Sequence, residues 1–123
     1  MKAFYFLGLI CFSVSLHATE KSTCEIQKHN LTMAMQVISN NMANVNTTRA
    51  PAGGPYKRQK LECEEGSCQM IYFDGFKVRY EPGHLDANEI GYVLYPDIDM
   101  MQEMEDMIQA TRDYEDVVKN CKP

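Results

Sequence analysis

A helical pattern of apolar residues fills the last part of the chain. Between 97 and 121 they recur at alternating steps of four and three, the spacing of a helix face that packs against a partner. Pro96 ends the run before it, and Asp97 or Asp99 can accept hydrogen bonds from the first amide groups of the helix. The stripe on this predicted helix consists of Met100, Met104, Met107, Thr111, Tyr114, Val118 and Cys121.

A second stripe with the same rhythm lies upstream, in the segment 23–45, where only Lys28 interrupts it. Its members are Cys24, Leu31, Met35, Ile38, Met42 and Val45. Each stripe is about 31 Å long at a rise of roughly 1.5 Å per residue. Laid antiparallel, the two stripes match end to end and set Cys24 against Cys121. We therefore predict an antiparallel helical hairpin built from the two ends of the chain.

The middle of the chain changes period from helix to strand. A loop at 46–55, rich in proline and glycine at its end, separates the first helix from a β region at 56–95. Asp74-Gly75 is a strong hairpin signal because both positions of such a turn need a positive φ. We expect a three-stranded meander around it. The predicted strands are 56–63, 69–73 and 76–80, with a short further strand at 91–95.

The predicted fold class is α+β: an antiparallel two-helix coiled-coil hairpin with a small antiparallel β meander inserted between its helices. The chain has 123 residues, enough for one domain. Its positive start and short apolar stretch predict a cleavable signal peptide over 1–18, which leaves a single domain over 19–123. The alternative, an uncleaved membrane anchor, is disfavoured because the polar run 19–23 follows at once. The domain consists of helix 23–45, loop 46–55, β region 56–95 and helix 97–121.

Removal of the signal peptide leaves four cysteines, and an even number in an exported chain favours two disulfides in an oxidising compartment. Four cysteines allow three pairings. The matched helices select Cys24 with Cys121, and Cys63 then pairs with Cys68 across a span that a hairpin turn can close. On a chain-entropy model the long loop contributes about 4 to 5 kcal/mol and the short one about 2 kcal/mol.

The charge and the motifs exclude several classes of function. The formal charge is −5 and becomes −6 when Lys2 leaves with the signal peptide, so general attraction to nucleic acid or anionic lipid is not expected. His29 and His84 do not form a short-spaced ligand set with the cysteines, and no catalytic motif is present. We predict no enzyme activity, metal, cofactor or small-molecule substrate. The acidic residues of the last helix lie off its stripe, on a solvated or partner-facing side: Glu103, Glu105, Asp106, Asp113, Glu115 and Asp116.

The segment Ser39–Thr47 resembles the asparagine-rich motif shared by the axial proteins of the bacterial flagellum. A further ordered set of segments resembles the FlgC family of proximal rod proteins: Gly54-Pro55-Tyr56, Tyr80-Glu81-Pro82-Gly83, Gly91-Tyr92-Val93, Pro96-Asp97-Ile98-Asp99, Glu103-Met104 and Ala110-Thr111-Arg112-Asp113-Tyr114-Glu115. The resemblance implies a structural subunit of the flagellar basal body in the periplasm. Such a subunit would assemble through its helical hairpin with other rod or basal-body subunits, or with itself.

The resemblance also implies residues of a subunit interface. The asparagines of the motif would hold the helix end and neighbouring subunits, the turn after 79 would shape an intersubunit loop, and two residues of the last helix would lie on or beside the packing seam. For each of them the alternative is a local role in capping, turn formation or core packing. In order, these residues are Asn40, Asn41, Asn44 and Asn46; Tyr80, Glu81, Pro82 and Gly83; Arg112 and Tyr114.

The chain also departs from the family pattern, because such proteins leave the cytoplasm through the flagellum's own export apparatus without a cleaved signal, and they usually lack cysteines. A second hypothesis follows from these departures. In it the chain is a disulfide-stapled, soluble periplasmic binding or accessory protein derived from the rod fold.

Overall fold

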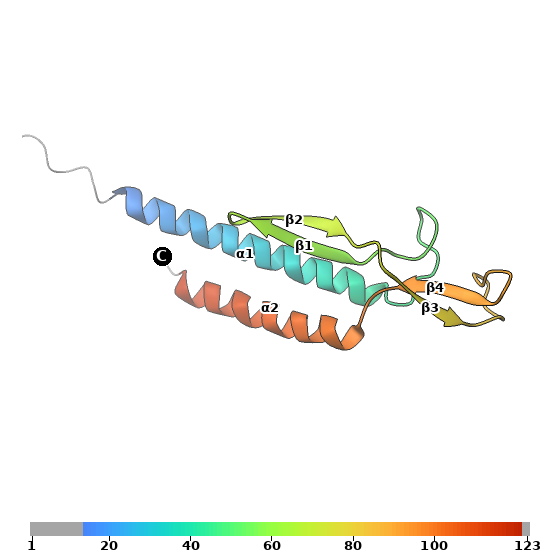
Figure 1. The fold of residues 1–123 in the computed structure, drawn as a ribbon. Coiled ribbons are helices and arrows are strands. Elements are labelled where there is room, and N and C mark those ends of the chain that lie inside the picture. Colours follow the sequence, from blue (N-terminus) through green and yellow to red (C-terminus); the bar gives the residue numbers. More distant parts are fainter. Residues whose placement is uncertain (1–13, 122–123) are drawn as a thin grey trace, which may run out of the picture.

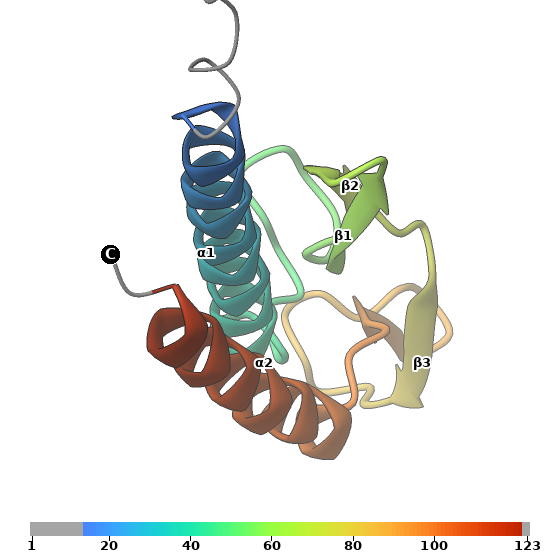
Figure 2. The same cartoon turned by 90° about the vertical axis from the view of Figure 1, so that its left-hand side faces the viewer.

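The computed structural model describes residues 14–121, so most of the predicted signal peptide lies outside the described residues. Two helices lie side by side and run in opposite directions (Figure 1). One pair of strands lies along the first helix and the other lies beyond its end (Figures 1 and 2). The fold is therefore α+β, as predicted. The elements are α1 (Val14–Ala43), β1 (Gln59–Glu64), β2 (Ser67–Tyr72), β3 (Phe76–Tyr80), β4 (Tyr92–Pro96) and α2 (Met100–Asn120).

The helices differ from their predicted bounds at the N-terminal ends. Helix α1 begins at Val14, nine residues before the predicted start, because no proline or glycine between 14 and 23 interrupts it. Asp99 caps α2, and its carboxylate accepts from the amides of Met101 at 2.9 Å and Gln102 at 3.4 Å. Neither helix within residues 14–121 has an apolar stretch sufficient to cross a bilayer.

The strands form two separate two-stranded antiparallel sheets, so the predicted three-stranded meander is wrong. β1 pairs with β2, and β3 pairs with β4. Glu65 and Gly66 supply the hairpin turn, with φ values of 50° and 80°, the two positive angles that a two-residue turn needs. Asp74-Gly75 instead links the sheets. The Phe73 amide donates to the Arg58 carbonyl at 2.8 Å, and this bond directs the chain away from β2.

The inward side of α2 also differs in part from the predicted stripe. Glu103 and Ala110 are buried, and Met107, Tyr114 and Val117 are partly buried, again at steps of four and three. Three members of the predicted stripe are exposed: Met104, Thr111 and Val118. Met104 is exposed because the carboxylate of Glu103 takes the inward position beside it. Thr111, although exposed, still faces α1, since its hydroxyl lies 3.9 Å from the Met35 sulfur. The upstream stripe agrees better with the structure, since Ile38 is buried and its other members are partly buried.

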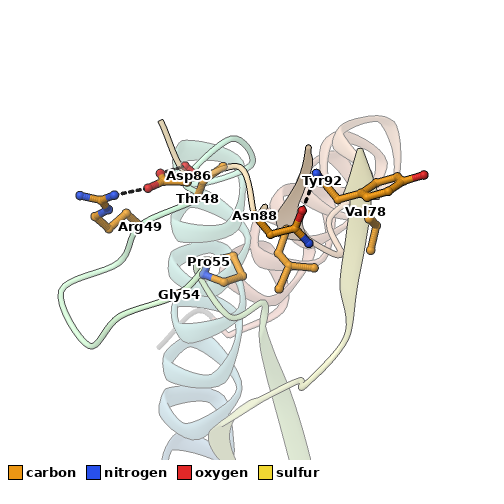
Figure 3. A pocket seen from close by; sticks show the side chains of 9 residues that line it. Thr48, Arg49, Gly54, Pro55, Val78, Asp86, Asn88 and Tyr92 are labelled. Carbon is orange, nitrogen blue, oxygen red and sulfur yellow. Dashed lines mark hydrogen bonds and ion pairs between the residues drawn. The ribbon is translucent and has the colours of Figure 1, made fainter. Parts of the chain in front are cut away.

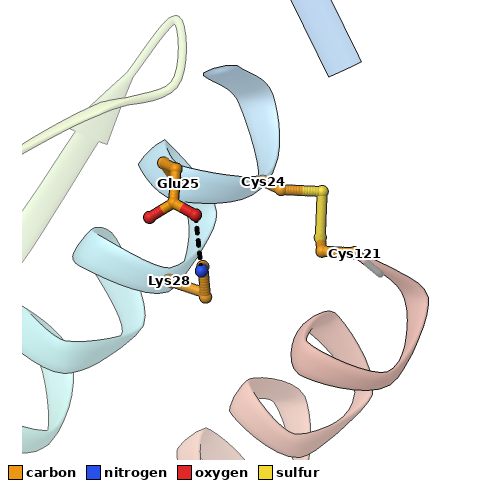
Figure 4. The surroundings of a disulfide bond; sticks show 4 residues. All are labelled: Cys24, Glu25, Lys28 and Cys121. Atoms are coloured by element: carbon orange, nitrogen blue, oxygen red, sulfur yellow. Dashed lines mark hydrogen bonds and ion pairs between the residues drawn. A yellow bond between two sulfur atoms is a disulfide. The ribbon is translucent and has the colours of Figure 1, made fainter. Parts of the chain in front are cut away.

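Both predicted cysteine pairs lie at bonding distance. Cys24 on α1 and Cys121 at the end of α2 have sulfur atoms 2.03 Å apart (Figure 4). Cys63 and Cys68 lie directly opposite each other on β1 and β2, with sulfur atoms 2.06 Å apart. The first pair joins the helices near the start of the described chain, and the second closes the β1–β2 hairpin.

Candidate assembly surfaces

A buried polar network ties the end of α1 to the rest of the molecule, and Asn41 lies at its centre with 1% of its surface exposed. Its amide nitrogen donates to the Gln59 carbonyl at 2.9 Å, and its amide oxygen accepts from the Gln59 amide at 2.8 Å. The Tyr56 hydroxyl donates to the same oxygen at 3.3 Å. Asn41 therefore pairs with the backbone of β1 as a neighbouring strand residue would.

The same asparagine reaches α2 through Glu103, whose side chain is also 1% exposed. The Asn41 amide nitrogen lies 3.3 Å from both carboxylate oxygens of Glu103, and Arg58 Nε donates to one of them at 2.9 Å. Burying a carboxylate is costly unless it is paired, and here the pairing is complete. Among the described residues, every buried side-chain nitrogen and oxygen has a hydrogen-bond partner.

The burial of Glu103 as a partner of Asn41 and Arg58 was not predicted from the sequence. The sequence analysis placed Glu103 on a solvated or partner-facing side of α2, and the structure shows it buried against Asn41. No helical period indicates such a carboxylate, because its partners come from α1 and from Arg58, the residue before β1. Burial in this environment, together with the charges of Tyr72 and Glu103, raises the pKa of Tyr56.

The other asparagines of the motif are bonded within the chain, with one exception. The Asn40 side chain donates to Gln59 Oε1 at 3.0 Å. The Asn44 side chain donates to the Asn40 carbonyl at 2.8 Å and accepts from the Thr47 hydroxyl at 3.1 Å. Asn46 is exposed. The local alternative thus describes what Asn40, Asn41 and Asn44 do in the isolated chain.

The predicted intersubunit loop begins at the end of β3 with Tyr80, which is 65% exposed. Glu81 turns inward, where its carboxylate accepts from the Tyr95 hydroxyl at 2.9 Å and raises the pKa of that tyrosine. Pro82 and Gly83 are exposed. The loop therefore presents three of its four residues to the outside.

Arg112 and Tyr114 lie on different sides of α2. Tyr114 is partly buried on the side that faces α1, beside Ala110 in the helical repeat. Arg112 is exposed, on the outward side of the helix. In the single chain, Tyr114 therefore lies on the side of α2 toward α1, and Arg112 lies on the side away from it.

Strands β3 and β4 form a ribbon with one covered and one uncovered face. On the covered face, Val93 is fully buried and Tyr95 is 6% exposed, with the Arg79 guanidinium 4.3 Å from the Tyr95 ring centroid. The other face is apolar; Pro96 is buried at its end, and its remaining side chains are between 40% and 65% exposed. We call it the ribbon face: Phe76, Val78, Tyr80, Tyr92 and Leu94.

A hollow of about 570 Å³ lies between the ribbon face and the loop 48–55. Figure 3 shows Arg49 and Asp86 on one side of it and Val78 and Tyr92 on the other. The Asp86 carboxylate accepts from the Thr48 hydroxyl at 2.7 Å and pairs with Arg49. The Thr48 hydrogen bond, with that of Arg49, holds the pKa of Asp86 below its usual value.

The described residues include no group of three histidine, cysteine or acidic side chains placed to hold a metal ion. Contiguous apolar surface of this extent is typical of proteins that bind other proteins. The described chain is therefore an α+β protein with an exposed apolar surface available for contact with another protein.

Comparison with known proteins identifies the particular class. The chain is 34% identical to the flagellar basal-body rod protein FlgC of Borreliella burgdorferi over 112 residues, which cover 68% of this chain and 74% of the relative. It is 30% identical to FlgC of Bacillus subtilis over 109 residues, covering 66% and 73% of the two chains. FlgC of Aquifex aeolicus is 33% identical over 93 residues, covering 66% and 69%. No family model matches the chain. The chain belongs to the FlgC family of flagellar basal-body rod proteins.

Proposed function

We propose that the chain is a structural subunit of the bacterial flagellar rod that assembles through its paired helices with other rod subunits. The observation that carries the proposal is the 34% identity to a FlgC protein over most of both chains. The fold supports it, because two antiparallel helices and an uncovered ribbon face offer contact surface. The proposal includes no enzymatic role, in keeping with relatives that are named rod proteins.

The helix pair is the proposed assembly element. We infer that α1 and α2 pack as a coiled coil, since their inward residues recur at steps of four and three. In this proposal the exposed interface residues contact neighbours, and the buried ones hold the contacting segments in place. The contacting residues are Asn46, Tyr80, Pro82, Gly83 and Arg112; the positioning residues are Asn40, Asn41, Asn44, Glu81 and Tyr114.

The proposed place of assembly is the periplasm, reached by cleavage of the signal peptide 1–18. There both disulfides would form, because the periplasm is an oxidising compartment. A covalent link between the ends of the helix pair would keep α2 on α1 before any neighbour is bound. The accessory-protein alternative finds no support in the comparisons, since the three relatives reported above are named rod proteins.

The proposal is tested by deleting the gene from its native cells and imaging the basal bodies. We expect rods to be absent or truncated and swimming to be lost, with both restored by the full chain. Restoration by a chain with both Cys24 and Cys121 changed to serine would show that the disulfide is dispensable without affecting the rod proposal. Complete rods and normal swimming in the deletion strain would overturn it.

A further inference from the structure

The outer edge of the β1–β2 sheet has no partner strand within residues 14–121. The inner edge, on β1, lies toward α1, where the Gln59 amide and carbonyl bond to the Asn41 side chain at 2.8 and 2.9 Å. Strand β2 lies on the far side of β1 from α1 (Figures 1 and 2). The edge of β2 is therefore open to a further strand.

The strand pairing shows which backbone groups of β2 point to this open edge. In an antiparallel pair, hydrogen-bonded and non-hydrogen-bonded residue pairs alternate along the strands. The Phe73 amide bonds to the Arg58 carbonyl, which fixes the alternation for the whole hairpin. Cys68, Met70 and Tyr72 consequently point their amide and carbonyl groups outward, where no hydrogen bond joins them to a described residue. The edge thus offers a donor and an acceptor at every second residue.

Strand β2 lacks the features that commonly protect an exposed edge, which are lysine residues, proline and bulges. Its sequence, SCQMIY, contains no proline and no charged residue, and its register with β1 is continuous over all six pairs. The hairpin is also held in place. The Cys63–Cys68 bond joins its strands, and the Asn30 side chain donates to the Gly66 carbonyl at 2.8 Å, which ties the turn to α1. Because the edge is ordered in advance, pairing with it loses less conformational entropy.

The two faces of the hairpin beside this edge differ in chemistry. Met70 and Tyr72 lie on one face and are 38% and 59% exposed. The other face is acidic near the turn and contains a hollow of about 620 Å³. None of the three glutamates at this hollow forms an ion pair with a described residue. The hollow is lined by Glu62, Glu64, Glu65, Ser67 and Gln69.

We propose that the open edge of β2 binds an extended segment of another protein, which adds to the sheet as a further strand. In this mode, main-chain hydrogen bonds supply affinity and alternating side chains supply specificity. An antiparallel segment would place apolar side chains opposite Tyr72 and Met70. Its next outward positions, opposite Gln69 and Ser67, lie on the acidic face and suit lysine or arginine.

The partner is a different chain rather than a second copy paired through the same strand. Strand β2 contains no lysine or arginine, so a second β2 would bring no positive charge to the acidic face. The inference goes beyond the proposed function and does not depend on it, since it concerns one edge of the folded chain.

The test uses the full, oxidised chain and the peptide acetyl-VTVKTK-amide, whose residues would face Tyr72 to Ser67 in order. In an NMR titration of the isotope-labelled chain we expect a Kd below about 1 mM, with shifts confined to β1, β2 and their turn. A peptide with both lysines replaced by glutamate should bind at least about tenfold more weakly, because like charges would then face each other.

Methylation of single peptide amides distinguishes strand addition from binding by side chains alone. Methylation of the valine amide opposite Met70 removes the donor to the Met70 carbonyl and should weaken binding at least about tenfold. The matched control methylates the threonine amide opposite Ile71, which points away from β2. Its affinity should stay within about threefold of the unmodified peptide.

Met70→Pro makes the complementary change in the protein. The Met70 amide points outward, so proline removes the edge donor without breaking a bond to β1. We expect this variant to lose peptide binding while both disulfides and the helical circular dichroism are retained. Met70→Ala keeps the amide and should still bind the peptide.

Four results would overturn the inference: no binding up to about 5 mM peptide; equal effects of the two methylations; shifts centred on the helices or the ribbon face; or self-association of the wild type that Met70→Pro abolishes. Failure of the proposed function is a separate outcome. Complete rods in the deletion strain would overturn the rod role and leave the strand-addition site, whereas absence of peptide binding would overturn the site alone.

Discussion

The asparagine network and the ribbon face differ in how completely one chain satisfies them. In the network, a buried amide and a buried carboxylate have all their partners within 3.3 Å, supplied by α1, α2, β1 and the segment just before β1. On the ribbon face, apolar side chains remain 40% to 65% exposed. The network is satisfied inside the single chain, whereas the ribbon face remains exposed. The contrast separates residues that build the subunit from residues that are available to join subunits.

Removal of the long disulfide should have the largest effect on the subunit itself. Changing Cys24 and Cys121 to serine is expected to lower the free energy of unfolding by about 4 to 5 kcal/mol, because the bond constrains a long loop of the unfolded chain. The matched control changes Cys63 and Cys68 to serine, for which we expect about 2 kcal/mol. Urea unfolding of the oxidised proteins, followed by circular dichroism, measures both. Equal losses in the two variants would contradict this difference.

Disruption of the asparagine network should cause the next largest loss of stability. Asn41→Ala removes a partner from the Gln59 backbone, the Tyr56 hydroxyl and the Glu103 carboxylate, so we expect a loss of about 3 kcal/mol. Asn46→Ala makes the same change at an exposed residue and should cost at most about 0.5 kcal/mol. Thermal unfolding of both variants makes the comparison. If the Asn41 variant is as stable as the Asn46 variant, the network does not hold the subunit together.

A valine-to-alanine substitution should lower the free energy of unfolding more on the covered face of the ribbon than on the ribbon face. Val93→Ala empties a fully buried position and is expected to cost about 2 kcal/mol. Val78→Ala, on the ribbon face at 60% exposure, should change the stability of the isolated chain by at most about 0.5 kcal/mol. Urea titrations at low protein concentration exclude effects of self-association. A larger loss for Val78 than for Val93 would reverse our assignment of the covered face.

The smallest effect concerns the hollow and its dependence on pH. Because hydrogen bonding lowers the pKa of Asp86 in the folded chain, its ionised form stabilises that state. Ionised Asp86 contributes fully to the stability of the folded chain at pH values above 3.8, the usual pKa of this carboxyl group. The contribution is lost as the pH falls from 3.8 through the lower pKa that Asp86 has in the folded chain. Asp86→Asn should therefore be less stable than the wild type near neutral pH, and the difference should shrink in acid. Unfolding curves from about pH 6 to pH 2 test this. A difference that does not change with pH would contradict the role of the charge.

The helix pair could be predicted from the sequence because its signals are local or periodic. Two stripes of equal length set Cys24 against Cys121, and two aspartates after Pro96, Asp97 and Asp99, marked the start of the last helix. Tyr114 and Met107 were correctly placed on the inward side. These features depend only on the geometry of a single helix, so they can be read from the sequence of that segment alone.

The polar network and the strand pairing could not be predicted, because they depend on contacts between distant segments. Glu103 displaces Met104 from the inward side of α2 only because Arg58 and Asn41 are there to receive it. The hairpin predicted at Asp74-Gly75 does not form, and the hairpin turn lies at Glu65-Gly66 instead. Strand β3 pairs with β4, which follows a long loop. Short strands carry too little information to select their partners.

The central claim is that this chain is built into the flagellar rod, and its direct test is quantitative mass spectrometry of basal bodies purified from native cells. We expect the chain in that fraction, in amounts comparable with other rod proteins, starting near Thr19 and four hydrogens lighter than after reduction. Recovery of the chain only from the soluble periplasmic fraction would contradict the claim.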